Sequence, residues 1–343
     1  MSTSSPSVPA RLRPPPAPEA RPGPLSGPVR TVRRQHRRAL WIVGPPVALA
    51  LLTATVLRGW WEVSEGSLPF FRGPALMNVL ASYSRDALVF LPIVVGAFVA
   101  GPLIARELES GTYRIAWTQA ISPARWLAVK LGLALAVAMT LTGCLVVAFR
   151  LLRGPFTGDE FAQFAWHDAE VFVAIGPVAF GYTAVGVALG ALVALLARHT
   201  VPAMVQTAVA VVGVMLALGH WRGALWPMRT LIGRDATLTD AGSTASLWGH
   251  GSGWMNAAGE RLDLGPCEDA AMRAAAQATE TPGDEHQRVF SQCVTDLGGV
   301  TAYFDHHTAA DFWPLQLVET GILLALAALA GWLAFRVLRR LHG

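Results

Sequence analysis

The sequence predicts an all-α polytopic membrane protein with six transmembrane helices and both termini in the cytoplasm. It also predicts a helical cytoplasmic segment between helices 2 and 3 and a large extracellular loop between helices 5 and 6. The 343 residues are 53% hydrophobic and only 15% charged, whereas about 25% of residues are charged in soluble domains. Several apolar runs reach the roughly 20 residues that cross a bilayer. Arginines gather in the two tails, which orients both tails inward.

The N-terminal region divides into a tail and a first membrane helix. Residues 1–29 contain nine prolines, which predicts a disordered Pro-rich cytoplasmic tail. Basic residues then fill Arg30–Arg38, before an apolar run of about 19 residues. A cleavable signal peptide is the alternative, but its apolar core would be only 7–15 residues long and followed by a small-residue cleavage site. We therefore expect a membrane helix here, with a kink at Gly44-Pro45-Pro46.

The predicted spans are, in order, about Ala39–Leu57, Ala87–Ala105, Trp126–Phe149, Val171–Ala197, Val201–Gly219 and Phe312–Val337. This scheme places helices 1–5 in residues 30–219, an extracellular domain in 220–311, and helix 6 with a basic C-terminal tail in 312–343. Arg198 and His199 form the whole predicted turn between spans four and five.

A small-residue step lies in the fourth span, where Gly186 and Gly190 are four positions apart. Such steps let two helix backbones approach closely. The glycine step could lie at a dimer interface or could let neighbouring helices of one bundle pack closely. Packing within one bundle is the more common role of such steps.

The extracellular segment, His220–Asp311, carries six arginines against twelve acidic residues and reads as loops and short helices. Cys267 and Cys293 both fall in it, while Cys144 lies in the third span. A disulfide between Cys267 and Cys293 would stabilise a domain with a small core in an oxidising compartment. Two free thiols are the alternative if that compartment is not oxidising.

The polar segment between spans two and three, residues 106–125, carries a dense set of charges that a plain hairpin would not need. Glu107 and Glu109 are two positions apart, so on a helix they point to different sides, and one could pair internally while the other faces a partner. Gly111 permits a sharp turn. Ser122 followed by Pro123 predicts the start of the next helix.

Several kinds of chemistry are missing from the sequence. Lys130 is the only lysine and follows Val129, so the Gly-Lys step of a phosphate-binding loop is absent and ATP must be used by another chain. Lys130 lies one turn into the third span, from which its amine can reach the cytoplasmic side.

Adjacent His306 and His307 could bind a metal with nearby acids, but no ligand spacing supports zinc. We expect no metal or bound cofactor.

Two polar residues enter the sixth span. Gln316 and Glu319 share a helix face near the outer surface. Glu319 is either an interfacial carboxylate or, with Gln316, part of an extracellular gate or substrate path.

The run VGAFVAGPLIARELESGTYRIAWTQAISPARWLAVKL resembles the second helix, coupling region and third helix of ABC-2 type transporter permeases, particularly those of high-GC Gram-positive bacteria. The positions that this resemblance assigns to ATPase coupling are Arg106, Glu107, Glu109, Gly111, Thr112, Thr118, Gln119, Ser122, Arg125 and Lys130. Pro123 departs from the family, which commonly has a basic residue there. A second resemblance to this family lies at the start of the sixth span and comprises Tyr303, Phe312-Trp313, Gln316 and Glu319. This chain has Asp311 where family members often have a basic residue.

The resemblance implies the membrane-spanning permease subunit of an ABC transporter in the plasma membrane, most often an exporter. It implies two permeases, identical or homologous, working with cytoplasmic ABC ATPase subunits that dock on 106–125, and no nucleic-acid partner. The alternative is a membrane sensor or anchor with an extracellular ligand-binding domain. A membrane-embedded enzyme would need a nucleophile, base or metal ligands at membrane depth, and the sequence offers none.

Overall fold

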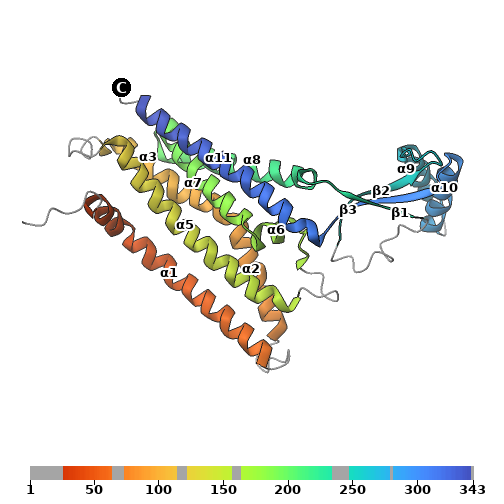
Figure 1. Ribbon diagram of the computed structural model, residues 1–343, viewed down its shortest axis with the longest axis horizontal. Coiled ribbons are helices and arrows are strands. Elements are labelled where there is room, and N and C mark those ends of the chain that lie inside the picture. The colour runs from red at the N-terminus through yellow and green to blue at the C-terminus, as the bar shows by residue number, and fades with distance from the viewer. Residues whose placement is uncertain are drawn as a thin grey trace, which may run out of the picture.

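The computed structural model describes residues 26–63, 73–113, 122–156, 164–233, 247–278 and 281–340, with side chains from residue 44 in the first helix and from residue 75 in the second. A bundle of long helices occupies one end of the elongated molecule, and a small domain stands at the other end on extended strands (Figure 1). Five helical stretches of the described chain are long and apolar enough to cross a membrane: Ala75–Ser110, Pro123–Phe156, Val178–Ala197, Thr200–Leu225 and Ala309–Arg340. The protein is therefore a multi-pass helical membrane protein.

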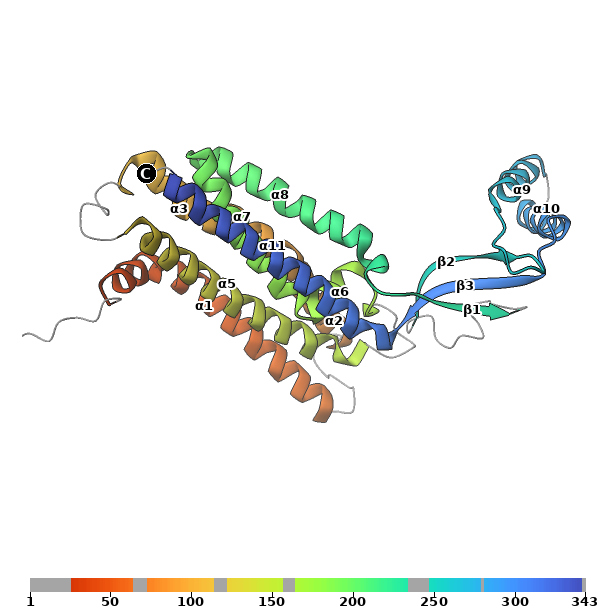
Figure 2. The same cartoon turned by 45° about the horizontal axis from the view of Figure 1, so that its top comes forward.

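The first helix, α1 (Ser26–Val63), contains the span predicted at about Ala39–Leu57 and is not one of these five. It lies along α5 (Pro123–Arg153) on the outside of the bundle in both views (Figures 1 and 2). It begins at Ser26, so the last residues of the predicted disordered tail are helical, and residues 1–25 lie outside the described chain. A sixth membrane crossing by α1 stays a prediction.

The second span is longer than predicted and contains a change of helix type. It runs through α2 (Gly73–Val94), the π-helical turn η1 (Val95–Ala100) and α3 (Gly101–Ser110). Pro92 lies inside α2, just before η1. Proline lacks the N–H for a helical bond and its ring collides with the preceding turn, which accounts for irregular helix beside it.

The predicted fourth span is wrong as one continuous helix. It is divided into α6 (Ala169–Ile175) and α7 (Val178–Ala197) at Gly176 and Pro177. Because Pro177 cannot donate a backbone bond and disfavours helical geometry in the residue before it, Gly176 adopts an extended conformation and α6 ends.

Helix α7 is the most deeply buried of the five candidate spans. It packs against α2, η1, α3, α5, α8 (Thr200–Trp221) and α11 (Phe312–Arg340). Gly186 lies against the backbone of Pro92, and Gly190 against Gly96. The glycine step therefore serves packing within one chain. The predicted two-residue turn of Arg198 and His199 between α7 and α8 is confirmed.

The outer segment, predicted to contain loops and short helices, also contains a small β-sheet. Strands β1 (Arg229–Gly233), β2 (Leu247–Met255) and β3 (Thr301–Thr308) form an antiparallel sheet in the order β1-β3-β2. Gly249 and Gly253 lie in β2, where the rings of Phe304 and Tyr303 cover them. Glycine at these positions leaves room for a cross-strand aromatic ring.

Helices α9 (Gly265–Gln277) and α10 (Pro282–Asp296) form a hairpin at the far end of the sheet (Figure 2). A disulfide joins Cys267 in α9 to Cys293 in α10. Cys144 is free. Strand β3 leads through the short helix η6 (Ala309–Asp311) directly into α11, so no loop separates the outer domain from the last span.

Candidate functional site

The candidate site lies where α3 ends and α5 begins, at the end of the bundle opposite the outer domain (Figure 1). Gly111 follows α3 in the left-handed conformation, with φ of 71°. Glycine adopts this conformation without the penalty that a Cβ would add, so it ends the helix and turns the chain. The Ser110 and Thr112 hydroxyls, 2.9 Å apart, bond across this turn.

The predicted restart at Ser122 and Pro123 is confirmed. Ser122 caps α5, its hydroxyl accepting the N–H of Arg125 at 3.3 Å, and Pro123 is the first helical residue. Residues 114–121 lie outside the described chain, and with them Thr118 and Gln119 of the predicted coupling set.

Glu107 and Lys130 form an ion pair that joins α3 to α5. The Lys130 side chain is only 5% exposed. Its amine also donates to the carbonyl of Leu103 at 3.1 Å, and lies 4.6 Å from the centre of the Trp126 ring. The Trp126 indole N–H donates in turn to Glu107 at 3.0 Å. We call Glu107, Lys130, Trp126 and Leu103 the inner clamp.

Glu109 joins α3 to a different helix, α8. Its carboxylate accepts the Thr200 N–H at 2.9 Å and the Thr200 hydroxyl at 2.6 Å, with His199 Nδ1 3.8 Å away. The first N–H groups of a helix have no partner in that helix, and a negative charge there is favourable. Glu109 therefore caps α8, while 48% of its side chain stays exposed.

The prediction that one of the two acids pairs internally while the other faces a partner is thus incomplete, because both bind within the chain. Glu107 is engaged by buried groups, whereas Glu109 is half open to solution. Arg106 and Thr112 are exposed, and Arg125 is half-buried. Glu109, Arg106 and Thr112 are thus among the exposed residues of the segment in the described chain.

A second polar cluster, which we call the outer clamp, lies at the opposite end of α8. Glu319 on α11 is fully buried and accepts bonds from Arg222 at 2.8 and 3.1 Å and from the Tyr182 hydroxyl at 2.7 Å. The Arg222 guanidinium also stacks on Phe172 at 4.4 Å. Glu319 is therefore not an exposed interfacial carboxylate.

Arg222 and Tyr182 were not predicted as site residues, because Arg222 follows the fifth predicted span and was assigned to the outer loop. A signal was available, because an arginine directly after an apolar run and a carboxylate inside another run are natural partners in a membrane.

Gln316 connects the two halves of the broken fourth span. Its amide nitrogen donates to the Phe172 carbonyl at 2.6 Å, and its amide oxygen accepts the Val178 N–H at 3.2 Å. These bonds supply partners to backbone groups that the break leaves unpaired. The role of Gln316 and Glu319 in a gate or substrate path stays a prediction.

The residues considered for a metal are bound to other groups. Asp305 accepts hydrogen bonds from Arg261 and Thr230. Asp311 accepts hydrogen bonds from the N–H and the hydroxyl of Thr308. His307 is fully buried with its Nε2 2.9 Å from the Gly223 carbonyl. In the described part of the chain no group of three or more His, Cys, Asp or Glu side chains could hold a metal ion.

Burial alone would raise the pKa of Asp305, but the hydrogen bonds from Thr230 and Arg261 outweigh it, and the pKa lies below its usual value. Tyr303, part of the second sequence similarity, lies against the same arginine, with the Arg261 guanidinium 4.2 Å from its ring centre. Both contacts stabilise the sheet below the α9–α10 hairpin.

A family model described as ABC-2 membrane transporter related matches residues 74–222. The match covers α2 to α8, and so contains the inner clamp, the capping contact of Glu109 and two residues of the outer clamp, Tyr182 and Arg222. No curated protein matches, and no solved structure does.

Proposed function

We propose that this chain is the membrane subunit of an ABC-2 type exporter, driven by a separate ATPase that docks on residues 106–125. The family match over residues 74–222 supports an ABC-2 type permease. The single observation that carries the docking site is the arrangement of α3. One short helix end holds both α5 and α8 through two neighbouring carboxylates. A force applied there would reach three membrane helices at once.

The orientation follows from charge. The arginine-rich tails would lie in the cytoplasm of a plasma membrane, with 106–125 beside them and the acidic outer domain outside. By this scheme the permease works as a homodimer or heterodimer, and the partner ATPase binds and hydrolyses ATP. The permease itself supplies no nucleotide site.

The proposed mechanism is a change in the population of two conformations. Closure of the ATPases would move the 106–125 segment, and the inner clamp and Glu109 would transmit that movement to α5 and α8. The conformational equilibrium can shift only by as much as the ATPase contacts differ in free energy between the two states. The outer clamp then links α8 to α11, which leads into the outer domain.

The test must use exposed side chains, because Glu107 also holds a buried lysine. We expect Arg106→Glu to reduce the ATPase activity that co-purifies with the permease by about tenfold, the effect of about 1.4 kcal/mol. Arg339→Glu is the matched control. Arg339 is also an exposed arginine, and it lies near the C-terminal end of α11, on the same proposed side of the membrane.

Equal loss in both variants, or no loss in either, would contradict docking on 106–125. Co-purification of a kinase or transcriptional regulator in place of an ATPase would support the sensor alternative.

A second comparison separates docking by Glu109 from its capping of α8. Thr200→Ala removes one of the two hydrogen bonds to Glu109 without changing the exposed carboxylate. If the carboxylate contacts the ATPase, Glu109→Ala should lose ATPase binding while Thr200→Ala retains it. Equal behaviour would restrict Glu109 to the capping role.

A further inference from the structure

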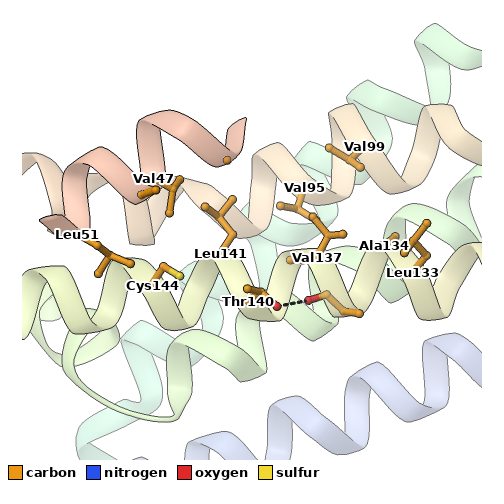
Figure 3. Close-up of a pocket in the computed structure, with 14 residues that line it drawn as sticks. Val47, Leu51, Val95, Val99, Leu133, Ala134, Val137, Thr140, Leu141 and Cys144 are labelled. Carbon is orange, nitrogen blue, oxygen red and sulfur yellow. Dashed lines mark hydrogen bonds between the residues drawn. The ribbon is translucent and has the colours of Figure 1, made fainter. Parts of the chain in front are cut away.

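A groove of ≈ 500 Å³ lies between α1, η1 and the middle of α5. Figure 3 shows Val47 and Leu51 of α1 on one side of it, Val95 and Val99 on another, and the side chains of α5 along its floor. The groove is separate from the inner and outer clamps, and none of its lining residues belongs to the coupling segment.

The lining excludes a polar ligand. Of the fourteen lining residues, only Thr140 and Cys144 carry a polar side-chain atom, and none is charged. The Thr140 hydroxyl donates to the carbonyl of Ala136 at 2.9 Å and so has its partner (Figure 3). Burying a polar ligand group here without a hydrogen bond would cost several kcal/mol.

Small residues create the space. Gly44 and Ala48 line it from α1, and Ala134 and Ala138 line it from α5. A Cβ on Gly44 would meet nothing within 4 Å. Pro45 and Pro46 lie in the same part of α1, where prolines interrupt the backbone bonds of a helix and bend it.

The depth of the groove along α5 indicates which part of the membrane surrounds it. Its lining on α5 runs from Leu133 to Cys144, a rise of about 16 Å along a helix that spans a hydrocarbon core of about 30 Å. At this depth the medium is the hydrocarbon of the lipids, and a narrow apolar groove admits a flexible chain.

The sequence before the groove adds charge. Five arginines, at positions 30, 33, 34, 37 and 38, lie within the fourteen residues that precede Gly44 in the sequence. They lie in the basic segment that the orientation of the proposed function places at the cytoplasmic surface. Basic residues beside a membrane helix there attract anionic lipid headgroups, by about 1 kcal/mol each.

We propose that this groove is a binding site for an acyl chain of an anionic phospholipid from the cytoplasmic leaflet, with the headgroup at the level of the basic segment. The choice of leaflet rests on the proposed orientation, but the binding does not depend on an ATPase. Because lipid tails are as apolar as the lining, shape and headgroup charge supply the selectivity rather than the hydrophobic effect.

Gly44→Leu introduces an apolar side chain into the groove lining at a position where the added Cβ would meet nothing within 4 Å, and Gly132→Leu is its matched control. Gly132 is also unobstructed and lies on α5, but it does not line the groove. The full chain would be purified and exposed to phosphatidylglycerol or phosphatidylcholine, and bound lipid counted by native mass spectrometry.

We expect Gly44→Leu to lower phosphatidylglycerol occupancy about tenfold, and Gly132→Leu to match the unaltered chain. Cys144, the one free cysteine, gives a second readout, because bound lipid should slow its alkylation by a membrane-permeant maleimide. Arg33→Gln/Arg37→Gln should remove the preference for phosphatidylglycerol over phosphatidylcholine, as should high salt.

Unchanged lipid occupancy and unchanged Cys144 protection in Gly44→Leu would overturn the proposal. Equal binding of both lipids by the unaltered chain would overturn the anionic assignment. Oxidative crosslinking of Cys144 between two chains would show instead that a second copy occupies the groove. These outcomes are independent of ATPase docking, which the Arg106 comparison tests.

Discussion

At the scale of single residues, Glu107 and Glu109 show how two carboxylates separated by one residue bind different helices. Glu107 neutralises a lysine that would otherwise be buried alone, and Glu109 supplies the cap that α8 lacks from its own residues. Removing the first should cost much more stability than removing the second, because an unpaired buried charge is far more costly than a lost cap.

We expect Glu107→Leu to lower the free energy of unfolding by about 3–5 kcal/mol, since it leaves Lys130 buried without its counter-ion. Adding Lys130→Met should restore most of the loss, because a buried apolar pair is often as stable as the ion pair that it replaces. Thermal unfolding in nanodiscs of the two single variants and the double variant measures this. A Glu107→Leu chain as stable as the unaltered one would show that the pair contributes nothing.

Asp305 should make the outer domain sensitive to acid. Its pKa is lower in the folded chain than its unfolded value of about 3.9. Its stabilising contribution is therefore complete well above pH 4 and is lost as the pH falls through the folded pKa. We expect Asp305→Asn to cost about 1 kcal/mol at pH 7, a modest value because Arg261 is half exposed.

The measurement is hydrogen exchange of β1 and β3 between pH 3 and pH 7, corrected for the intrinsic pH dependence of exchange. The difference between the two chains should shrink towards pH 3. A constant difference would exclude titration of this carboxyl group.

At the scale of elements, the helices were more predictable than the strands. Runs of about twenty apolar residues located α5, α7, α8 and α11, because hydrocarbon requires this length. The strands were not recognised. The glycines of β2 suggested a loop, whereas cross-strand rings of Phe304 and Tyr303 cover them. That pairing depends on residues of β3 that lie fifty or more positions later in the chain, which no local pattern reveals.

The glycines of α7 give a test at this scale. A Cβ on Gly186 would overlap the backbone of Pro92, which cannot move aside as a flexible side chain would. We expect Gly186→Ala to destabilise the helical bundle by about 1–3 kcal/mol. Gly213→Ala in α8, where nothing lies within 4 Å, should be neutral or gain up to about 1 kcal/mol.

Thermal unfolding measures both, with size-exclusion chromatography alongside. A Gly186→Ala chain of unchanged stability but altered oligomeric state would favour the dimer seam instead.

At the scale of the whole molecule, the sequence predicted the polar segment at 106–125 and the membrane helices, but not the long-range contacts that join them. The motif at 106–125 was visible because its charges interrupt apolar runs. The contact between Glu109 and Thr200 joins residues ninety-one positions apart, and that between Arg222 and Glu319 joins residues ninety-seven apart. Such pairings follow from the packing of α3, α8 and α11 around α7, which periodicity cannot supply.

The disulfide should matter for the outer domain and not for the bundle. Cys267 and Cys293 are separated by 26 positions, and closing a loop of that length contributes about 3–4 kcal/mol by the chain-entropy model. We expect Cys267→Ala/Cys293→Ala to increase hydrogen exchange in α9 and α10 while leaving α7 protected. Cys144→Ala is the control, and loss of protection throughout the chain would show that the two parts unfold together.

Helix α8 has only three buried residues along its 22-residue length, yet a polar contact fixes each of its ends. A helix held in this way transmits displacement in both directions. If the proposed ATPase docks on 106–125, an antibody fragment that binds the outer domain and favours one position of α8 would change the affinity of that ATPase, and the ATPase would change the affinity of the antibody by the same factor. In the proposed orientation, a ligand outside the cell could then regulate ATPase binding inside it.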